Sequence, residues 1–429
     1  MRVLMLTWEY PPHQVGGLGR HVAGLSQALG EQGQEVHVLT RGEEGEVRDG
    51  RVWVHRVQPY TLNSLDFPTW VLQMNVALLE RAMTTGERYG PFHLLHAHDW
   101  LVAFTARALK HAWRLPLVAT IHATEAGRNQ GLYNDLQRYI SGVEWWLTYE
   151  AWRVIVCSRH MRREVQQLFQ LPEDKVKIIP NAVNEEAPPP IEPWFRERYA
   201  HPSEKIVFFV GRLVREKGAQ VLLEAAPMVL ATCPEAKFVI AGEGPLKQSL
   251  AEQAAALGLG PKVYLTGYID DATLLKLYRC AAVSVFPSLY EPFGIVALEA
   301  MAAGTPVVVS DTGGLGEIVR HAETGLKALP GNAFSLANQI TYLLQHQERA
   351  REMAQRARET VRRLYNWPNM ASLTLQVYQE VRRAYRQSAW GSKRQGRATA
   401  AARAPYDLAG RRMAVLGARY TATGRQGGP

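Results

Sequence analysis

Two glutamates in one short segment are the residues best placed to do chemistry in this sequence. Glu291 precedes Pro292 and Gly294, which mark a helix start, and Glu299 falls two turns into that helix. At 1.5 Å per residue the second carboxylate lies roughly 10 Å beyond the first. A solvated helix face is the alternative for Glu299, but its neighbours are apolar. This placement favours hydrogen bonds to separate sugar and ribose hydroxyls over a glycosidase pair, whose carboxyls face each other at about 5–10 Å.

Two cations follow the first strand of the second half of the chain. Residues 211–218 come directly after an apolar run and contain Arg212 and Lys217. Fixed positive charges at the carboxyl end of a strand, together with helix-start amides, suit a diphosphate. Solvated surface charges explain this segment equally well when it is taken by itself.

A glycine-rich turn follows the first apolar run and opens the first helix. Residues 15–20 read VGGLGR. Gly16 and Gly17 allow backbone N–H groups to approach an anion, and the helix start adds partial positive charge. The G-x-G-x-x-G spacing of a dinucleotide site is absent, and no Walker lysine follows. A tight turn without a ligand is the alternative interpretation.

Histidines end two neighbouring predicted strands. His96 and His98 alternate along one strand, and His122 ends the next. Alternating histidines suit a metal, but no third ligand stands at a recognisable spacing, so we predict hydrogen-bonding roles for them. The sequence also contains no D-x-D, which argues against a metal-dependent sugar-nucleotide site. We therefore expect no metal, with leaving-group charge met by Arg212, Lys217 and backbone amides.

The elements that must hold these residues follow an alternating pattern. Short runs rich in valine, isoleucine and leucine suit parallel strands buried on both faces, and the amphipathic stretches between them suit crossover helices. The first set of predicted strands covers residues 2–7, 35–40, 51–57, 94–97, 117–121, 153–157 and 176–179, with helices at 19–31, 68–85, 100–112 and 159–169. The pattern restarts with strands at 206–210, 237–241, 263–266, 283–286 and 305–310, and with helices that include 218–231 and 272–279.

A proline-rich segment with neither strand nor helix periodicity separates the two sets of elements and predicts a linker. The sequence therefore predicts an α/β protein of two doubly wound, Rossmann-like domains that face a cleft. The domains cover residues 1–184 and 205–364, and the linker covers 185–204. Ligands of open parallel sheets sit beyond the carboxyl ends of the strands, so the strand-end loops are expected to line that cleft.

The end of the chain differs from the rest in composition. An amphipathic helix is predicted at 365–387, with Leu373, Val377 and Val381 on one face, and residues 388–429 are expected to form a disordered, basic tail. The 429 residues include 49 basic and 40 acidic side chains, a net charge of +9. From Val381 onward there are 11 basic residues and one acidic residue. The body is therefore close to neutral, and the charge excess belongs to the tail.

Cysteine spacing and hydropathy indicate the environment. Cys157, Cys233 and Cys280 have none of the C-x-x-C spacings of a metal or redox site, and we expect them to be buried in a reducing cytosol. Residues 1–7 form an apolar run that is followed closely by Glu9, and this run is too short for a signal-peptide core. No stretch approaches 18 uncharged apolar residues. We expect a cytoplasmic protein.

Taken together, the motifs resemble those of the retaining glycosyltransferases of the two-domain B fold, specifically the large family 4. The ordered series consists of Gly16-Gly17, His122, Arg212 with Lys217, Glu291 through Glu299, Thr305-Pro306-Val307 and Gly313-Gly314. It extends from the first strand to about residue 386 and leaves only the tail outside. The resemblance implies that the terminal helix crosses back to the first domain.

The resemblance also implies roles at the donor nucleotide. The amide of Gly17, beside Gly16, would bind the donor diphosphate. Arg212 and Lys217 would neutralise the phosphates as the sugar leaves, and Glu299 would hold the ribose. No cofactor or metal is implied beyond the donor substrate itself.

Further roles are implied around the transferred sugar. Glu291 would bond one of its hydroxyls, aided by the backbone amides of Phe293 and Gly294, and His122 would contact the sugar near the reacting carbon. The resemblance implies front-face attack by the acceptor hydroxyl, with the departing phosphate helping to take its proton. Configuration would be retained without a covalent enzyme intermediate.

The remaining implied contacts concern the base and the acceptor. Tyr268 and Ile269 would flank the nucleotide base, and His98 and Asp99 would lie on the acceptor side. The segment around His98 and the glycine loop look like those of glycogen and starch synthases, which favours glucose transfer from an ADP-, UDP- or GDP-linked donor to a saccharide or glucan acceptor. Two features depart from those synthases. Gln14 stands where they carry a lysine, and the second glutamate, which bacterial members usually lack, is present.

Three other functions fit the same sequence. A transferase for a lipid or cell-surface saccharide acceptor would contact a bilayer peripherally through Trp145, Trp146, Trp152 or residues 68–85, although we expect each to pack in the core. A polyanion or membrane-surface binder would act through the basic tail and lose its binding at high salt. Nucleic acid is not the expected partner. A sugar-nucleotide epimerase on the same scaffold would require no acceptor.

Overall fold

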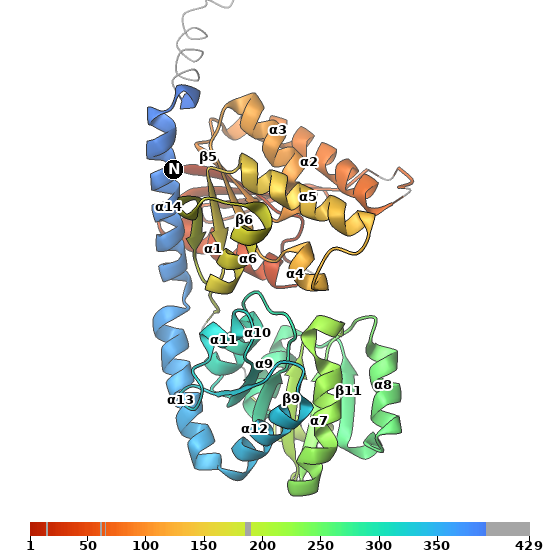
Figure 1. The fold of residues 1–429 in the computed structure, drawn as a ribbon. Helices are drawn as coiled ribbons and strands as arrows, with labels where there is room; N and C mark the ends of the chain where they lie inside the picture. Colours follow the sequence, from red (N-terminus) through yellow and green to blue (C-terminus); the bar gives the residue numbers. More distant parts are fainter. Residues whose placement is uncertain (14–15, 61, 65, 185–189, 392–429) are drawn as a thin grey trace, which may run out of the picture. The chain divides into compact units, whose positions relative to one another are not determined.

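Two parallel-stranded sheets covered by helices make up most of the chain (Figure 1). The structure, a computed structural model, describes residues 1–13, 16–60, 62–64, 66–184 and 190–391. Its contacts define one unit, Met1–Arg382, and a second unit that begins at Arg383. The predicted α/β class with two doubly wound, Rossmann-like domains is confirmed. Part of the predicted linker and nearly all of the predicted tail lie outside the described residues.

The first sheet contains eight strands in the order β3-β4-β2-β1-β5-β6-β7-β8. The strands are β1 Arg2–Leu6, β2 Glu35–Arg41, β3 Gly45–Asp49, β4 Val52–Val57, β5 Leu94–His98, β6 Leu117–Ile121, β7 Arg153–Val156 and β8 Val176–Ile178. They pair in parallel, except that β3 and β4 form an antiparallel hairpin at one edge. The apolar pattern does not predict β3, because its sequence GEVRD is mostly polar and lies at the surface.

The second sheet contains six strands in the order β11-β10-β9-β12-β13-β14, all in parallel. The strands are β9 Lys205–Val210, β10 Ala236–Ala241, β11 Val263–Gly267, β12 Val283–Phe286, β13 Val307–Ser310 and β14 Leu326–Ala328. Five of them fall on the predicted runs. The three-residue β14 was not predicted, since its apolar run is too short to stand out from the loops around it.

Helices connect successive strands and cover the faces of both sheets (Figure 1). Those of the first half are α1 Gly17–Glu31, α2 Phe67–Tyr89, α3 Ala103–Trp113, α4 Glu125–Asn129, α5 Asp135–Glu150 and α6 Arg159–Phe169. Those of the second half are α7 Ala219–Thr232, α8 Lys247–Ala256, α9 Asp271–Cys280, α10 Ile295–Ala302, α11 Leu315–Ile318, α12 Ala333–Gln345 and α13 Gln347–Leu364, followed by α14 Trp367–Gln387.

The alternation of side chains along β1 divides the first domain into layers. Leu4 and Leu6 belong to a core that includes apolar residues of α2, α3 and α5. Val3 and Met5 point to the opposite face and belong to a core with α1 and α14. The strand is thus buried on both faces, which explains why it reads as a continuous apolar run.

Strand order reverses at one place in each sheet, next to the first strand of that sheet. In the first sheet β1 lies between β2 and β5, and in the second β9 lies between β10 and β12. Such a switch point forms a crevice beyond the carboxyl ends of the strands, where ligands of these folds bind. The glycine turn after β1, His98 at the end of β5, Lys217 after β9 and Glu291 after β12 all lie at these two points.

The terminal helix α14 packs against the first domain, as the family resemblance implies. Its buried face contains Met370, Ala371, Thr374, Val377, Tyr378 and Val381. The prediction that Leu373 belongs to this face is wrong, because that side chain is 37% exposed. Positions 370, 374, 377 and 381 recur at helical spacing, whereas position 373 is rotated off their stripe.

Tryptophans and cysteines follow the predictions only in part. Trp145 on α5 is 46% exposed, so the expected core packing is wrong for this residue, whereas Trp146 and Trp152 are partly buried. Among the described residues, no helix has the length and apolar character needed to cross a membrane. Cys157 and Cys233 are buried as expected, and Cys280 is half-buried.

Candidate active site

An ion pair joins two loops at the strand ends of the second sheet. Lys217 ends a short 3₁₀ turn after β9, and its Nζ donates to Oε2 of Glu291 at 2.7 Å. Ser288 Oγ lies 3.3 Å from the same carboxylate oxygen. The side chains of Lys217 and Glu291 are only 28% and 9% exposed, so water screens this attraction weakly. Two residues predicted from separate motifs therefore form one charged pair.

Glycines fix the backbone around Glu291. The N–H of Gly314 donates to the Glu291 carbonyl at 2.8 Å. Gly313 has φ +50°, and a Cβ there would lie 2.0 Å from the same carbonyl oxygen. Gly294 caps α10 with φ +104°, where a Cβ would lie 2.5 Å from Leu315 Cδ2. Any side chain at these positions would displace the loop that carries the carboxylate.

The second glutamate is also paired, and its side chain is only 15% exposed. Glu299 accepts from Arg20 Nη1 at 2.9 Å and from Tyr278 Oη at 3.3 Å, and Arg20 also pairs with Asp271. Burial raises the pKa of Glu299, while the Arg20 cation acts in the opposite direction. The alternative of a solvated helix face is therefore wrong. Sequence reasoning missed Arg20, because nothing in the sequence links it to a partner 279 residues away.

The start of α1 lies against the start of α10. Gly16 caps α1, and a Cβ on Gly17 would lie 3.1 Å from Ile295 Cδ1. The amide of Gly19 donates to Glu9 Oε1 at 2.9 Å, and Glu9 is buried. The glycine turn thus adjoins the loops of the second sheet. A diphosphate would share this helix start with the carboxylate of Glu9.

Other predicted donor residues lie farther from this pair or offer only their backbone. The Arg212 side chain is 58% exposed, and Tyr268, after β11, is 78% exposed. Ile269 is partly buried against the core. The Phe293 ring is buried, with its centroid 6.1 Å from that of Tyr365, which leaves the backbone amide as its group for a ligand. The structure therefore brings Lys217 to Glu291 but joins neither Arg212 nor Tyr268 to them.

The first-sheet side of the site is built from imidazoles. His96 is hydrogen-bonded through both nitrogens, with Nδ1 2.7 Å from Tyr378 Oη and Nε2 2.7 Å from Thr120 Oγ1. His98 Nδ1 lies 3.2 Å from His122 Nε2. The prediction of hydrogen-bonding roles is confirmed for His96 in full, and for His98 through one nitrogen. Tyr378 of α14 thereby anchors the end of β5.

Asp99 connects this imidazole group to the backbone. Its Oδ1 accepts from the N–H of His122 at 2.7 Å, and its own backbone has φ +59°, which is unusual for a residue other than glycine. Burial raises the pKa of Asp99 to about 6. Burial, together with the nearby Arg128 cation, lowers the pKa of His122 to about 3. The imidazole of His122 is therefore uncharged at neutral pH.

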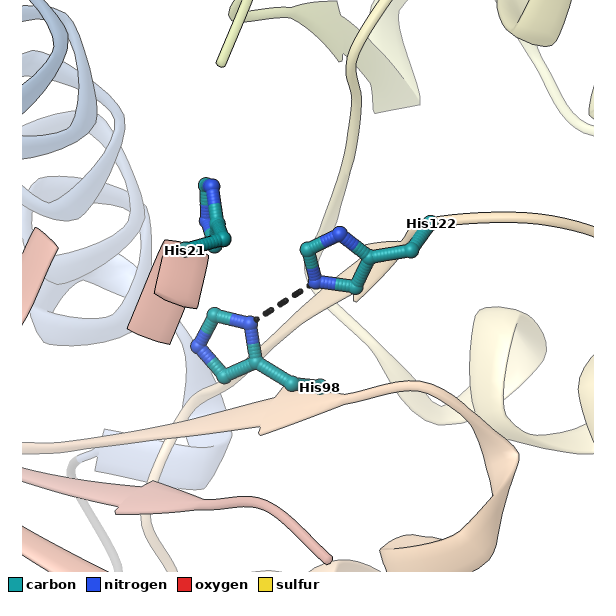
Figure 2. Close-up of side chains that lie close together, drawn as sticks. All are labelled: His21, His98 and His122. Carbon is teal, nitrogen blue, oxygen red and sulfur yellow. Dashed lines mark hydrogen bonds between the residues drawn. The ribbon is translucent and has the colours of Figure 1, made fainter. Parts of the chain in front are cut away.

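A further histidine joins the group from α1. His21 lies with its ring centroid 4.8 Å from that of His122 and 5.6 Å from that of His98 (Figure 2). It is buried, and burial lowers its pKa well below the usual value. Sequence reasoning missed His21, although it stands one residue after the glycine turn and at the start of the helical pattern.

One buried carboxyl beside this group was also missed. Glu144 on α5 accepts from the N–H of Glu125 at 2.9 Å through one oxygen and at 3.2 Å through the other. Burial raises its pKa to about 8, with Asp99 acting in the same direction and Arg128 opposing. The first-sheet side therefore keeps this acid mostly protonated at neutral pH.

Known proteins share both halves of this arrangement. Residues 15–187 match the family described as Glycosyltransferase Family 4, and residues 191–360 match the family described as Glycosyl transferases group 1. An uncharacterized glycosyltransferase of Methanocaldococcus jannaschii is 40% identical over 395 residues, which are 88% of this chain and 98% of that protein. A glycogen synthase of Mycobacterium tuberculosis is 37% identical over 405 residues, 90% of this chain and 96% of that protein.

A solved structure shares the same fold. Sucrose-phosphate synthase from Thermosynechococcus elongatus aligns with a TM-score of 0.76 at 27% identity. The alignment covers 89% of this chain and 99% of that one. The likeness therefore extends over both sheets and the helices around them.

Proposed function

Because the chain belongs to glycosyltransferase family 4 of the two-domain B fold and is of the glycogen and starch synthase type, we propose that it transfers glucose with retention of configuration. The donor is an ADP-, UDP- or GDP-linked glucose, and the acceptor is a saccharide or glucan, as in α-glucan synthesis. The observation that carries the proposal is the Lys217–Glu291 pair, 2.7 Å apart, at the ends of β9 and β12. The relatives named glycogen synthase and sucrose-phosphate synthase support a hexosyl donor.

In this proposal the phosphates and the ribose bind on the second-sheet side. Lys217 interacts with the diphosphate while it stays paired with Glu291. The exposed side chain of Arg212 moves onto the diphosphate, and the amide of Gly17 donates a hydrogen bond to it. Glu299 accepts from the ribose hydroxyls and is held in place by Arg20 at 2.9 Å. Cations placed singly in a partly buried site stabilise the charge that develops on the leaving phosphate.

The transferred sugar lies between the two sheets in the same proposal. Glu291 accepts from one of its hydroxyls, and the amides of Phe293 and Gly294 donate to others. His122 contacts the sugar from the first-sheet side, with its ring oriented by the hydrogen bond between its Nε2 and His98 Nδ1 at 3.2 Å. A neutral imidazole suits this place, because it both donates to and accepts from hydroxyl groups.

The reaction makes one bond and breaks one at the anomeric carbon. The acceptor oxygen bonds to that carbon on the face from which the phosphate oxygen departs, so the configuration is kept. The acceptor proton moves to the departing phosphate oxygen, and the nucleoside diphosphate leaves with the electron pair of the broken bond. Lys217 and Arg212 supply the positive charge that a metal would otherwise supply, so the proposed transfer is metal-independent, and EDTA should not lower its rate.

A screen of nucleotide sugars tests the proposal directly. The full chain is mixed with ADP-, UDP- and GDP-linked sugars, and thermal stabilisation and slow donor hydrolysis are measured. We expect one glucose donor to raise the melting temperature and to be hydrolysed, and glucan to accelerate its use. No response to any nucleotide sugar would contradict the proposal. Conversion of the donor to a different, intact nucleotide sugar without an acceptor would instead favour an epimerase.

The surface of α2 favours a second acceptor class. Leu72, Val76 and Met83 are exposed on that helix, and Trp145 is exposed on α5. An apolar helix face suits peripheral contact with a bilayer, so a lipid-linked or cell-surface saccharide is the alternative acceptor. Co-sedimentation with phospholipid vesicles that is lost in Val76→Glu would support this acceptor. The alternative of a polyanion binder depends on residues after 391, outside the described part of the chain.

A further inference from the structure

Three histidines of the site come from three different elements. His21 lies on α1, His98 ends β5, and His122 follows β6. One ligand atom of each lies within 4.8 Å of the others, and Figure 2 shows the three side chains grouped around a common space. The proposed transfer uses His122 for the donor sugar, but it gives His21 no task.

Several nitrogens of this group lack partners. Neither ring nitrogen of His21, nor Nε2 of His98, has a hydrogen-bond partner among the described residues. The Asn181 side chain lies beside His21 and acts to raise its pKa against the larger effect of burial, but it makes no hydrogen bond of normal geometry with it. Leaving a buried polar atom unpaired is unfavourable, so such atoms usually have a ligand, an ion or a water.

The neighbouring His96 shows what a structural histidine looks like in the same place. Both of its nitrogens are bonded at 2.7 Å, to Tyr378 and to Thr120. It therefore has no ligand atom left and is excluded from the group. The contrast with His21, which is equally withdrawn from solvent, points to a ligand for the latter.

The geometry and charge of the group suit a metal of intermediate softness. Zinc binds imidazole nitrogens at 2.0–2.1 Å, which places two ligands of a tetrahedral site about 3.3 Å apart. His98 Nδ1 and His122 Nε2 are already 3.2 Å apart. The carboxylate of Asp99, bonded to the backbone of His122 at 2.7 Å, supplies negative charge beside them.

We propose that His21, His98 and His122 bind one Zn²⁺ ion, with water as a fourth ligand, and that this ion inhibits the enzyme. Binding requires the proton between His98 Nδ1 and His122 Nε2 to move to the other nitrogen of its own ring, a change of tautomer that leaves a lone pair on both atoms for the metal. His21 must also move toward them. The inhibition rests on the proposed function, because a metal on His122 removes that imidazole from the donor sugar. The binding itself does not rest on it.

Zinc binding is measured first, on the metal-free full chain without any nucleotide sugar. Competition with a chromophoric zinc chelator should give one tight equivalent, and Co²⁺ in its place should give the visible absorption bands of a four-coordinate site. His21→Ala and His98→Ala should each weaken binding at least tenfold, whereas His346→Ala, at an exposed position, should not. Absence of the cobalt bands, or unchanged affinity in His21→Ala, would overturn the site. The cobalt spectrum is measured on the wild-type chain, so this test does not depend on whether a variant folds.

Inhibition is measured second, with the donor found in the nucleotide-sugar screen. Added Zn²⁺ should lower turnover with the affinity found in the chelator competition, and EDTA should restore it. In His21→Ala the zinc concentration for half-inhibition should rise at least tenfold. Zinc that binds without slowing turnover would overturn the inhibitory role. If no nucleotide sugar is ever used, the proposed function fails while the zinc site is still decided by the binding experiment.

Discussion

The two sides of the site handle charge in opposite ways. On the first-sheet side His122 is partly buried and neutral, and Glu144 is held mostly protonated. On the second-sheet side Lys217 and Glu291 form an ion pair, and Glu299 is paired with Arg20. Under the proposed function each side suits the ligand that it binds. Sugar hydroxyls on the first-sheet side need groups that donate and accept hydrogen bonds, whereas a diphosphate on the second-sheet side needs fixed cations.

Arg20 is the exception that joins the two sides. It lies on α1 of the first domain, yet its guanidinium binds Glu299 and Asp271 of the second. A buried carboxylate left without its cation would gain a proton instead of keeping its charge. The charged side of the site therefore depends on one residue supplied by the neutral side.

The largest expected effect comes from breaking the charged pair of the second-sheet side. Under the proposed function, Lys217→Ala and Glu291→Ala should each lower transfer by orders of magnitude, because each would remove a contact to the reacting sugar or phosphate and leave its partner unpaired. Steady-state turnover with the glucose donor measures this effect. Near-normal turnover in either variant would contradict the assigned roles.

A lysine–glutamate pair elsewhere in the second domain provides the matched control. Lys262 Nζ donates to Glu204 Oε1 at 2.8 Å, nearly the separation found in the site pair. Lys262→Ala should leave turnover within about twofold of normal, because it contacts no predicted donor residue. Melting temperatures of all variants would separate lost chemistry from lost folding. A Lys262 variant as slow as Lys217→Ala would mean that ion pairs matter here only for stability.

A smaller effect is expected from Arg20, the link between the sides. Arg20→Ala should weaken donor binding about tenfold, because the pKa of Glu299 rises further and the protonated carboxyl holds ribose less well. The loss should be much smaller in a Glu299→Gln background, since coupled residues deviate from additivity by about 0.5–3 kcal/mol. Donor titrations of the four proteins measure this coupling. Additive effects, or tighter donor binding in Arg20→Ala, would show that the pair does not support the ribose site.

The contrast between the two sides also explains how far the sequence could be interpreted. Lys217 and Glu291 stand in separate local motifs, each at a strand end, and parallel-sheet topology alone brings such ends together. Arg20 ends the glycine turn and His21 follows it directly, but their partners are fixed by the contact between α1 and the loops of distant strands. No local pattern encodes that contact. The same limit applies to Trp145, whose exposure depends on which face of α5 the rest of the domain covers.

The neutral side can be tested through its stability. The pKa of Glu144 is raised to about 8 in the folded chain, so the unfolded chain releases this proton more readily. The contribution of Glu144 to the free energy of unfolding should therefore fall as pH rises from about 4.5 to about 8, by on the order of 5 kcal/mol. Glu144→Gln removes that loss and should raise the melting temperature by several degrees at pH 8 but little at pH 4.5.

A second glutamate of α5 provides the control of opposite sign. Burial acts to raise the pKa of Glu150, but bonds from Lys110, His111 and Arg107 outweigh it and lower the pKa. Its stabilisation is present above the unfolded pKa and is lost as pH falls through the folded one. Glu150→Gln should therefore lower the melting temperature at pH 8. An equal shift in both variants at pH 8 would contradict the assigned protonation state of Glu144.

The smallest effect is expected from the most charged part of the sequence. Truncation after Gln387 removes eight basic residues and one acidic residue, yet donor affinity at 0.15 M salt should change less than twofold. Screening limits the range over which exposed charges interact to about 8 Å. Under the proposed function a diphosphate is therefore recognised by single cations such as Lys217 and not by net charge. Donor titration of the truncated chain tests this, and a fivefold loss of affinity would mean that the tail takes part in the site. Loss of binding to an immobilised polyanion, with donor affinity kept, would assign the tail a separate partner and leave the contrast between the two sides of the site intact.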